Sequence, residues 1–327
     1  MTLRPERYYR NAGAVPFKGT MMMLIAGGLT AIVLSFVYAV VDYYNPFIYF
    51  TFIATALLGA AIGGAVSWGG TVGAVRNRGF RLLVGIACGL IGVYFSWVWF
   101  ILILAEWNPE AIALDPLQMV NFIQFLAING VWEIQGSRPT GMALYAIWLI
   151  EAAMIFGIAA TTAGQAIEPY CEPCGRWTEA VEEVLFLPHT DPAALQVDLE
   201  EERYEALDKL SDAEVDRGDC LTVTLRKCPE CDESNFLSVG HLTVTQTKEG
   251  PQVNTKPLIT GLCVPDEVVE RIRERARKAE EAIQHAFMPA EEGDAADDDT
   301  VSEDVAEEPS SELAGDGTLA ADQERQR

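Results

Sequence analysis

Long apolar runs, separated by short polar connections, fill the first half of the chain. A helix of about 20 apolar residues crosses the hydrocarbon core of a bilayer, so runs of this length predict membrane spans. After residue 167 the pattern changes to mixed helical and alternating periods, which indicates a second, water-exposed region. The expected spans are residues 19–42, 47–75, 81–105 and 141–166.

A further apolar stretch, residues 117–132, competes as a fifth span. It is only about 16 residues long, which favours an interfacial or re-entrant helix. Its polar residues Gln118, Asn121 and Gln124 recur every three positions and predict one wet face. A fifth span would instead move everything after it to the other side of the membrane.

Basic residues predict the orientation, because Lys and Arg concentrate in cytoplasmic loops. They occur in the N-terminal tail and between spans two and three, whereas residues 106–140 hold a single Arg. The chain is therefore predicted to be a multi-pass protein of the inner (plasma) membrane with both termini cytoplasmic. The basic residues are Arg4, Arg7, Arg10, Lys18, Arg76, Arg78 and Arg81.

Small residues recur at helical spacing in spans two and three, and such stripes let helix backbones approach closely in lipid. The short connection between these spans predicts that they form a tight antiparallel hairpin. A glycine-lined conduction path is the alternative interpretation. The residues concerned are Gly59, Gly63, Gly70 and Gly73, then Gly85, Gly89, Gly92 and Ser96.

Glu151 is an acidic residue in the middle of the fourth span. An ionisable group at this depth is costly and suggests a functional site. No Lys, Arg or His lies at a matching depth in the other spans. Its expected partners are hydroxyl groups, such as those of Tyr38, Thr51, Thr55 or Tyr94. Either it is a neutral interhelical hydrogen-bonding group, or it serves a small transporter or channel.

The region after the spans predicts an α+β domain. Residues 176–217 are acidic and are expected to be helical. Residues 220–228 and 235–247 alternate between apolar and polar positions, which predicts antiparallel strands. After a turn at 248–252, residues 256–264 predict another strand and residues 266–287 a charged helix.

Composition sharpens this division. The formal net charge is -24 although half of the residues are hydrophobic, so charge and apolarity must be segregated. Nucleic acid is excluded as a partner, because phosphate backbones require a basic surface. Residues 289–327 are rich in Ala, Asp, Glu and Gly, which predicts a disordered acidic tail.

Two Cys-x-x-Cys pairs carry the chemistry of the second region: Cys171 with Cys174, and Cys228 with Cys231. Four thiolates arranged as a tetrahedron form the preferred structural Zn²⁺ site, and a reducing cytoplasm keeps them as thiols. The pairs are 53 residues apart, so the acidic helical stretch is interpreted as an insertion. Both turns contain residues that favour tight turns, such as Pro173 and Pro229.

These paired turns resemble those of zinc ribbons and of rubredoxin, which holds iron instead. The resemblance covers roughly residues 170–265 and implies a small β core clamped by metal, used for structure or for protein contact. Rubredoxin-like iron electron transfer is therefore an alternative to structural zinc. The membrane half resembles bacterial multi-pass membrane proteins without an assigned activity.

The remaining cysteines and histidines give weaker signals. His241 follows the second pair closely enough to replace one cysteine ligand. The other predictions are packing for Cys88, core positions on strands for Cys220 and Cys263, and surface positions for His189 and His285.

The predicted domains are a four-span region at 1–167, a cytoplasmic metal-binding domain at 168–288 and the tail at 289–327. No catalytic triad, phosphate-binding loop or paired-carboxylate site is apparent, so a non-enzymatic role is predicted. The cytoplasmic zinc domain is expected to bind a protein partner or to regulate. The alternatives are a transporter or channel subunit that uses Glu151 and a membrane redox protein that uses the cysteine pairs.

Overall fold

The computed structural model describes residues 5–44, 48–108, 115–131, 138–182, 184–210, 215–216, 218–248 and 250–287. The chain divides into two compact units, residues 1–282 and 283–327. The predicted acidic tail, 289–327, lies outside the described residues. The domain boundaries given above stay predictions, although the last long apolar helix ends at Ala163 and the first strand starts at Tyr170.

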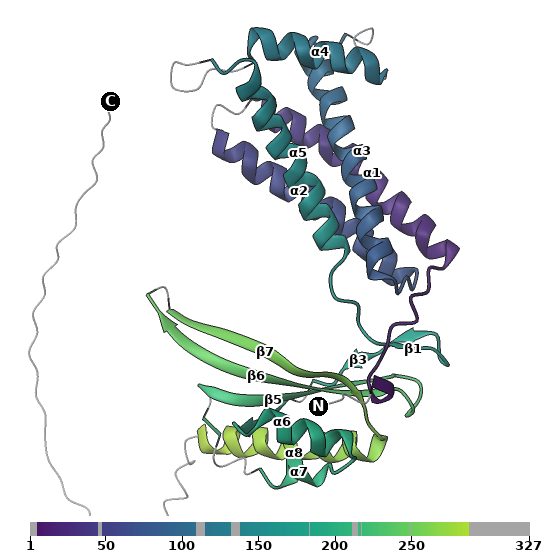
Figure 1. The fold of residues 1–327 in the computed structure, drawn as a ribbon, viewed down its shortest axis with the longest axis vertical. Coiled ribbons are helices and arrows are strands. Elements are labelled where there is room, and N and C mark those ends of the chain that lie inside the picture. Colours follow the sequence, from purple (N-terminus) through teal and green to yellow (C-terminus); the bar gives the residue numbers. More distant parts are fainter. Residues whose placement is uncertain are drawn as a thin grey trace, which may run out of the picture. The chain divides into compact units, whose positions relative to one another are not determined.

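Within the described residues, four helices are long and apolar enough to cross a membrane, as the sequence predicts. They pack around a core that includes Met23, Ile62 and Ile155, and large apolar side chains on their outer surfaces are exposed. Exposed apolar surface on this scale suits lipid rather than water. The helices are α1 (Phe17–Tyr44), α2 (Ile48–Val72), α3 (Arg78–Leu104) and α5 (Met142–Ala163) (Figure 1).

Residues 117–132 form most of α4 (Pro116–Asn129), which is shorter than the four membrane-length helices. Asp115 caps its N-terminus by accepting a hydrogen bond from the Leu117 N–H. Met119 and Leu126 pack against the C-terminal part of α3. Gln118, Asn121 and Gln124 are exposed, but so are Leu117, Val120, Phe125 and Ile128, so the exposed side of α4 mixes polar and apolar residues and the single wet face stays a prediction. Whether this helix lies in the interface or re-enters the membrane stays a prediction.

The glycine stripes pack against different neighbours from those predicted. α2 lies mainly against α1 and α5, and its contact with α3 is smaller. A Cβ on Gly63 would lie 2.5 Å from the Ala159 carbonyl oxygen of α5, and one on Gly85 would lie 2.8 Å from the same atom. Gly73 meets Gly19 of α1. A short connection makes α2 and α3 antiparallel but does not make them the closest pair, because α1 and α5 also pack against their small residues.

The second region is built on a five-stranded antiparallel sheet in the order β3-β5-β6-β7, with β4 also paired to β5. β5 (Asp219–Lys227) and β6 (Asn235–Thr247) confirm the two alternating segments. β7 (Gly250–Cys263) starts earlier than predicted, because Pro251 and Gln252 pair with β6 instead of extending the turn. β1 (Tyr170–Cys171) and β2 (Arg176–Trp177) form a separate ribbon.

The prediction of helix throughout 176–217 is wrong. Its first part forms β2, β3 (Glu179–Ala180) and β4 (Leu185–Pro188), and only the later part forms helices, α6 (Pro192–Glu200) and α7 (Glu205–Asp208). Leu185 and Leu187 are buried opposite Val223 and Leu221 of β5, whereas Phe186 is exposed. The acidic stretch is therefore part of the sheet domain rather than an insertion.

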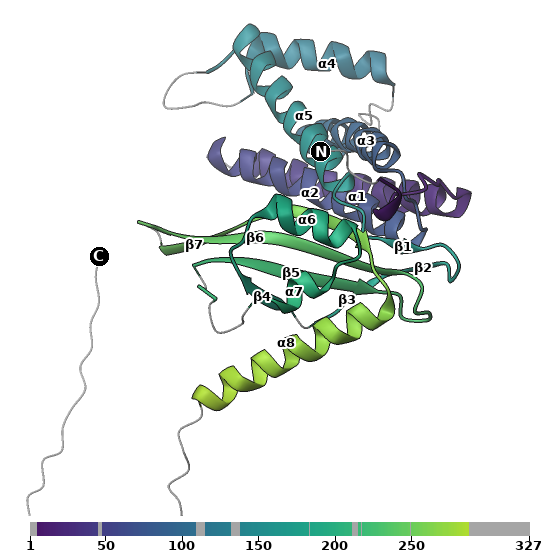
Figure 2. The ribbon, with the colours of Figure 1, turned by 60° about the horizontal axis from the view of Figure 1, so that its bottom comes forward.

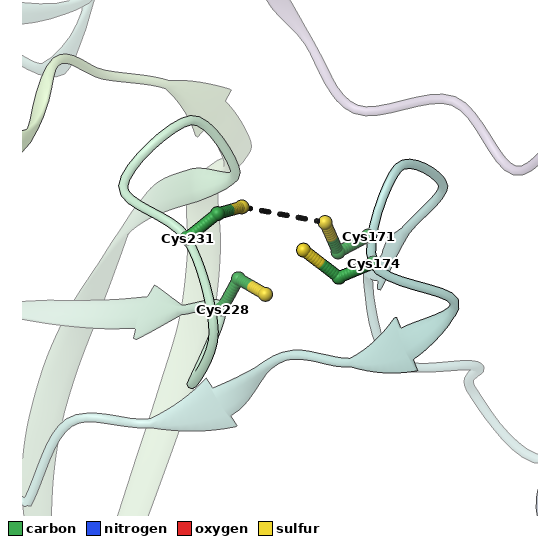
Figure 3. A group of neighbouring side chains, drawn as sticks. All are labelled: Cys171, Cys174, Cys228 and Cys231. Atoms are coloured by element: carbon green, nitrogen blue, oxygen red, sulfur yellow. Dashed lines mark hydrogen bonds between the residues drawn. The ribbon is translucent and has the colours of Figure 1, made fainter.

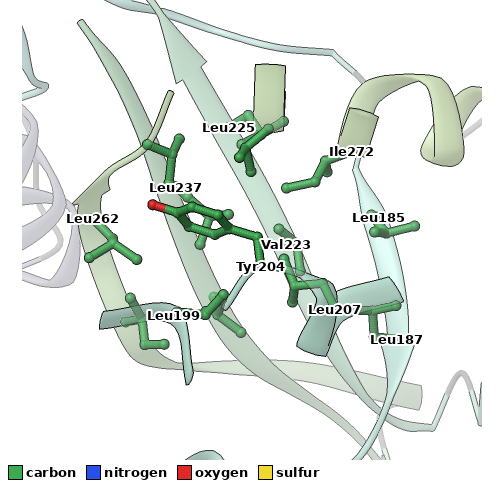
Figure 4. Packing of buried hydrophobic residues seen from close by; sticks show 14 of the residues in the cluster. Leu185, Leu187, Leu199, Tyr204, Leu207, Val223, Leu225, Leu237, Leu262 and Ile272 are labelled. Carbon is green, nitrogen blue, oxygen red and sulfur yellow. The ribbon is translucent and has the colours of Figure 1, made fainter. Parts of the chain in front are cut away.

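The core of this domain lies between the sheet and three helices, α6, α7 and α8 (Asp266–Phe287), which cover one face of the sheet (Figures 1 and 2). Alternate residues of β4, β5 and β6 meet Leu199, Tyr204 and Ile272 from the helices (Figure 4). α8 confirms the predicted helix and has Asp266 and Glu267 in its first turn, where acidic groups stabilise a helix.

The N-terminal segment before α1 is part of the sheet domain. The Tyr9 N–H donates to the Gly261 carbonyl at 2.8 Å, and Tyr8 forms a β-bridge with Leu262 of β7. The Tyr9 ring packs edge-on against Phe236 with centroids 5.0 Å apart. Because the start of the chain lies beside the domain that follows α5, both emerge on the same side of the helices, as four crossings require.

Candidate metal centre

Two tight turns bring the four predicted cysteines together. The first turn joins β1 to β2, and the Gly175 N–H closes it on the Cys171 carbonyl at 2.9 Å. Gly175 has φ +66°, a left-handed conformation that glycine adopts at little cost. The second turn joins β5 to β6, where the Cys228 N–H donates to the Ser234 carbonyl at 3.1 Å. All four sulphur atoms lie within 4.8 Å of one another (Figure 3).

The spacing of the sulphur atoms suits a tetrahedral metal site. Zn–S bonds of about 2.3 Å place the sulphurs of a tetrahedron about 3.8 Å apart. The Cys171 and Cys231 Sγ atoms are 3.6 Å apart, far beyond a disulfide bond of about 2.05 Å. All seven cysteines of the chain are free thiols. The four cysteines therefore lie close enough to hold a metal ion.

Hydrogen bonds around the first turn favour thiolate at Cys171. Burial raises the pKa of this thiol, but hydrogen bonds from the Ser234 hydroxyl, the Cys174 backbone N–H and the other thiols lower it to about 7. The Ser234 hydroxyl donates to Cys171 Sγ at 3.2 Å. The pKa of Cys174 is raised, mainly because Cys231 hydrogen-bonds to its neutral form. These hydrogen bonds stabilise the thiolate form of Cys171, which is the form that binds a metal ion.

Ionic contacts brace the second turn. Lys227 Nζ lies 2.7 Å from Asp266 Oδ1 at the start of α8 and 3.2 Å from Asp232 Oδ1 in the turn. The hydrogen bond to Asp266 is the main reason that the pKa of Lys227 is raised. Arg176 also pairs with Glu230 at 2.7 Å, which joins the two turns directly. The turns are therefore held in place by protein groups as well as by any metal.

The first turn also contacts the ends of the membrane-length helices. Arg76, in the α2–α3 connection, stacks its guanidinium 4.3 Å from the centroid of the Tyr170 ring and pairs with Glu172 inside the turn. The Trp177 indole N–H donates to the Thr71 carbonyl of α2 at 2.8 Å. The metal centre is thus placed between the sheet and the helices.

The other predicted ligands and thiols fall elsewhere. His241 is not near the sulphurs, so its suggested ligand role is wrong: it lies beside Asp219 at the far end of β5 from Cys228. Cys88 and Cys220 are buried as predicted, but Cys263 is exposed at the end of β7 rather than in the core. His189 is exposed, as predicted, and the side chain of His285 lies outside the described residues.

Glu151 lines a small cavity among α1, α3 and α5 of about 40 Å³, which is large enough to hold water. Tyr38, one of its predicted hydroxyl partners, lines the same cavity, whereas the hydrogen bond between them stays a prediction. Sequence reasoning missed Asp42, which also lines the cavity. Asp42 is the last residue of the span predicted at 19–42, and α1 continues past it to Tyr44. Thr51 donates to Asp42 Oδ1 at 3.2 Å.

Comparison of the chain with protein-family models, with curated proteins and with solved structures gives no match. The chemistry of the site itself therefore carries the functional argument.

Proposed function

We propose that this chain is an integral inner-membrane protein, with both termini cytoplasmic, whose zinc-binding domain serves as an interaction or regulatory module rather than as an enzyme. The observation that carries the proposal is the close grouping of Cys171, Cys174, Cys228 and Cys231 on two turns. The zinc-ribbon resemblance of these turns supports the same role.

The donor set favours zinc over most other ions. Four thiolates are soft ligands that select Zn²⁺, Cu(I) or iron, and hard cations such as Mg²⁺ and Ca²⁺ prefer oxygen. Zinc is redox-inert and adopts the tetrahedral geometry that the sulphur spacing matches. A four-cysteine site has no open position for substrate, which favours a structural role. Iron in the same site is the alternative that experiment must exclude.

The position of the site suggests how metal would regulate. The first turn is tied to the helices through Arg76 and Trp177, and the second is continuous with β5 and β6 of the sheet. One ion bound by both turns would link the sheet to the helix ends. Loss of the ion would loosen that link and change how the domain is presented to a cytoplasmic protein partner.

Elemental analysis of the full chain in detergent tests the proposal. We expect one Zn²⁺ per chain, and Cys228→Ser should abolish it because three thiolates hold zinc less well than four. Cys88→Ser, which alters a buried thiol in α3, should leave the zinc content unchanged. A folded chain without metal, or with iron and a rubredoxin-like absorption spectrum, overturns the zinc assignment.

A partner is tested by affinity purification from cells that express either the wild-type chain or Cys228→Ser. We expect at least one cytoplasmic protein to co-purify with the wild-type chain and to be depleted with the variant. Identical partner sets from both would show that the metal centre does not serve interaction.

The cavity at Glu151 favours one second candidate, a small transporter or channel subunit. Asp42 and Glu151 place two carboxyl groups on one cavity with Tyr38 and Ser96, an oxygen-rich lining that suits a proton or a small cation. Proteoliposomes containing the purified chain would then show cation-dependent flux that Glu151→Gln abolishes. Glu106→Gln, at an exposed position beyond α3, is the matched control. Absence of flux in wild-type vesicles would rule this candidate out.

A further inference from the structure

On three neighbouring strands, every second side chain faces the core of the sheet domain. At one end of each strand, the last side chain on that face is one that can bind a metal. On β4 the row runs Leu185, Leu187 and then His189, which follows the strand. On β5 it runs back through Val223 and Leu221 to Asp219. On β6, Val239 is opposite Val223, and the next residue on that face, His241, is opposite Leu221. Because residues two apart share a face of a strand, the three polar side chains gather at one rim of the core.

The donor atoms are already close together. His241 Nε2 lies 2.5 Å from Asp219 Oδ1, and His189 Nδ1 lies 3.9 Å from the same oxygen. The three residues each offer one ligand atom, and these atoms lie within 4.8 Å of one another. Metal–nitrogen and metal–oxygen bonds of about 2.0–2.2 Å require only a small rotation of the exposed His189 side chain.

A simple ion pair does not account for this grouping. The bond between His241 and Asp219 leaves no need for a second imidazole, yet the ring of His189 lies with its centroid 4.6 Å from that of His241. Two imidazoles this close repel when protonated, and a shared metal ion removes that cost because both bind it as neutral ligands. The chain has only three histidines, and two of them are here.

We infer that His189, Asp219 and His241 form a second metal site, which takes a divalent transition metal ion such as Zn²⁺, Co²⁺, Ni²⁺ or Cu²⁺. Imidazole nitrogen suits these ions, and a set of two histidines and one carboxylate leaves coordination positions open. The side chains of His189 and Asp219 are about half exposed, so the ion can exchange with solution. Four thiolates, in contrast, would fill every coordination position of a tetrahedral ion.

Cobalt alone is the probe that separates the two sites. The full chain, purified in detergent without a polyhistidine tag and stripped of metal, is titrated with Co²⁺. We expect two Co²⁺ per chain: one with the charge-transfer absorption of thiolate ligands and one with only the weaker bands of nitrogen and oxygen ligands. Cys228→Ser should remove the first and leave the second, so the two assignments fail or succeed separately.

Variants of the second site give the decisive comparison. His241→Gln and Asp219→Asn should each weaken the second Co²⁺ by more than the roughly 10–100-fold that outer-sphere partners contribute. His285→Gln, at the remaining histidine, should have no effect. Retention of the thiolate band shows that a variant is folded. If a variant loses that band, His189→Gln is tested in place of that variant. The exposed His189 side chain lies beyond the end of β4, so this substitution should not disturb the fold.

Binding of Co²⁺ by the wild-type chain with the thiolate charge-transfer absorption alone, and with no second ion of nitrogen and oxygen type, would overturn the inference. So would a second Co²⁺ whose affinity is unchanged in His241→Gln and His189→Gln. Either result would show that the cluster is only a hydrogen-bonded rim of the core.

Discussion

At the scale of single residues, Ser234 stabilises the thiolate form of one predicted metal ligand, Cys171. Its hydroxyl donates to Cys171 Sγ at 3.2 Å and helps to lower the pKa of that thiol to about 7. Ser234→Ala should raise this pKa, so that protons compete with metal at higher pH. We expect zinc affinity to fall roughly 10–100-fold, as it does when other groups that hydrogen-bond to a metal ligand are removed, and half-release of zinc to occur at a higher pH.

Competition with a chelator across a pH series measures this change. Ser238→Ala is the control, because that hydroxyl accepts a hydrogen bond from the Gly261 N–H and does not touch a sulphur. Equal pH profiles for Ser234→Ala and wild type would mean that the hydroxyl does not tune the site.

Lys227 is the residue on which the bracing of the second turn depends. Its ammonium group lies within 3.4 Å of carboxylates from Asp232, Asp266 and Glu270. Lys227→Met leaves these three like charges close together without a cation. A partly exposed network of this kind contributes about 1 kcal/mol, and the effect should shrink as salt screens it.

Thermal unfolding at low and at high salt checks the effect of this substitution. Lys248→Met, at the exposed tip between β6 and β7, should leave the melting temperature unchanged. If the melting temperature of Lys227→Met falls by the same amount at low and at high salt, the cause is altered packing and not the lost charge.

At the scale of elements, the N-terminal segment acts as part of the sheet domain. Tyr9 packs on Phe236, donates its N–H to Gly261 and accepts a hydrogen bond from the Tyr170 N–H at its hydroxyl. Tyr9→Ala should therefore destabilise the domain by roughly 2 kcal/mol, from lost apolar burial and a lost aromatic pair.

Limited proteolysis of the full chain, read as cleavage within residues 168–287, measures this loss. Arg10→Ala alters the neighbouring exposed residue and should not change the cleavage rate. Unchanged protection in Tyr9→Ala would show that the segment rests on the domain without stabilising it.

Element by element, the sequence predicted what strong periodicity encodes. The long apolar runs became the four membrane-length helices, and the alternation at β5 and β6 and the period of α8 gave the correct elements. The helix predicted for residues 176–188 was wrong because strands of two to four residues are too short to show a period of two. Their structure depends on pairing with β5, which is a tertiary contact.

The same limit separates the two candidate metal sites. The cysteine pairs can be recognised from their spacing in the sequence alone, because both ligands of each pair lie in one local turn. His189 and His241 are 52 positions apart, and only the register of β4 and β6 against β5 brings them together. Because the sequence does not predict β4, it does not predict this register either. The two histidines were therefore interpreted separately.

At the scale of the whole molecule, orientation in the membrane is the remaining prediction. The N-terminal segment and the sheet domain lie on one side of the helices, and α4 packs near the opposite end of α3 from Arg78. The basic residues at 4–18 and 76–81 predict that the sheet side is cytoplasmic. Two exposed glutamines, Gln118 on α4 and Gln252 on β7, then mark opposite sides.

Cysteines at these two positions give a matched pair for labelling in intact cells. A membrane-impermeant thiol reagent, with sites identified by peptide mass spectrometry, should modify Gln118→Cys at once and Gln252→Cys only after permeabilisation. The reverse pattern would invert the topology, and labelling of both in intact cells would refute an even number of spans. Because Gln252 lies on the sheet that carries the second cysteine turn, the result also decides whether the metal centre faces the reducing cytoplasm that keeps its thiols free.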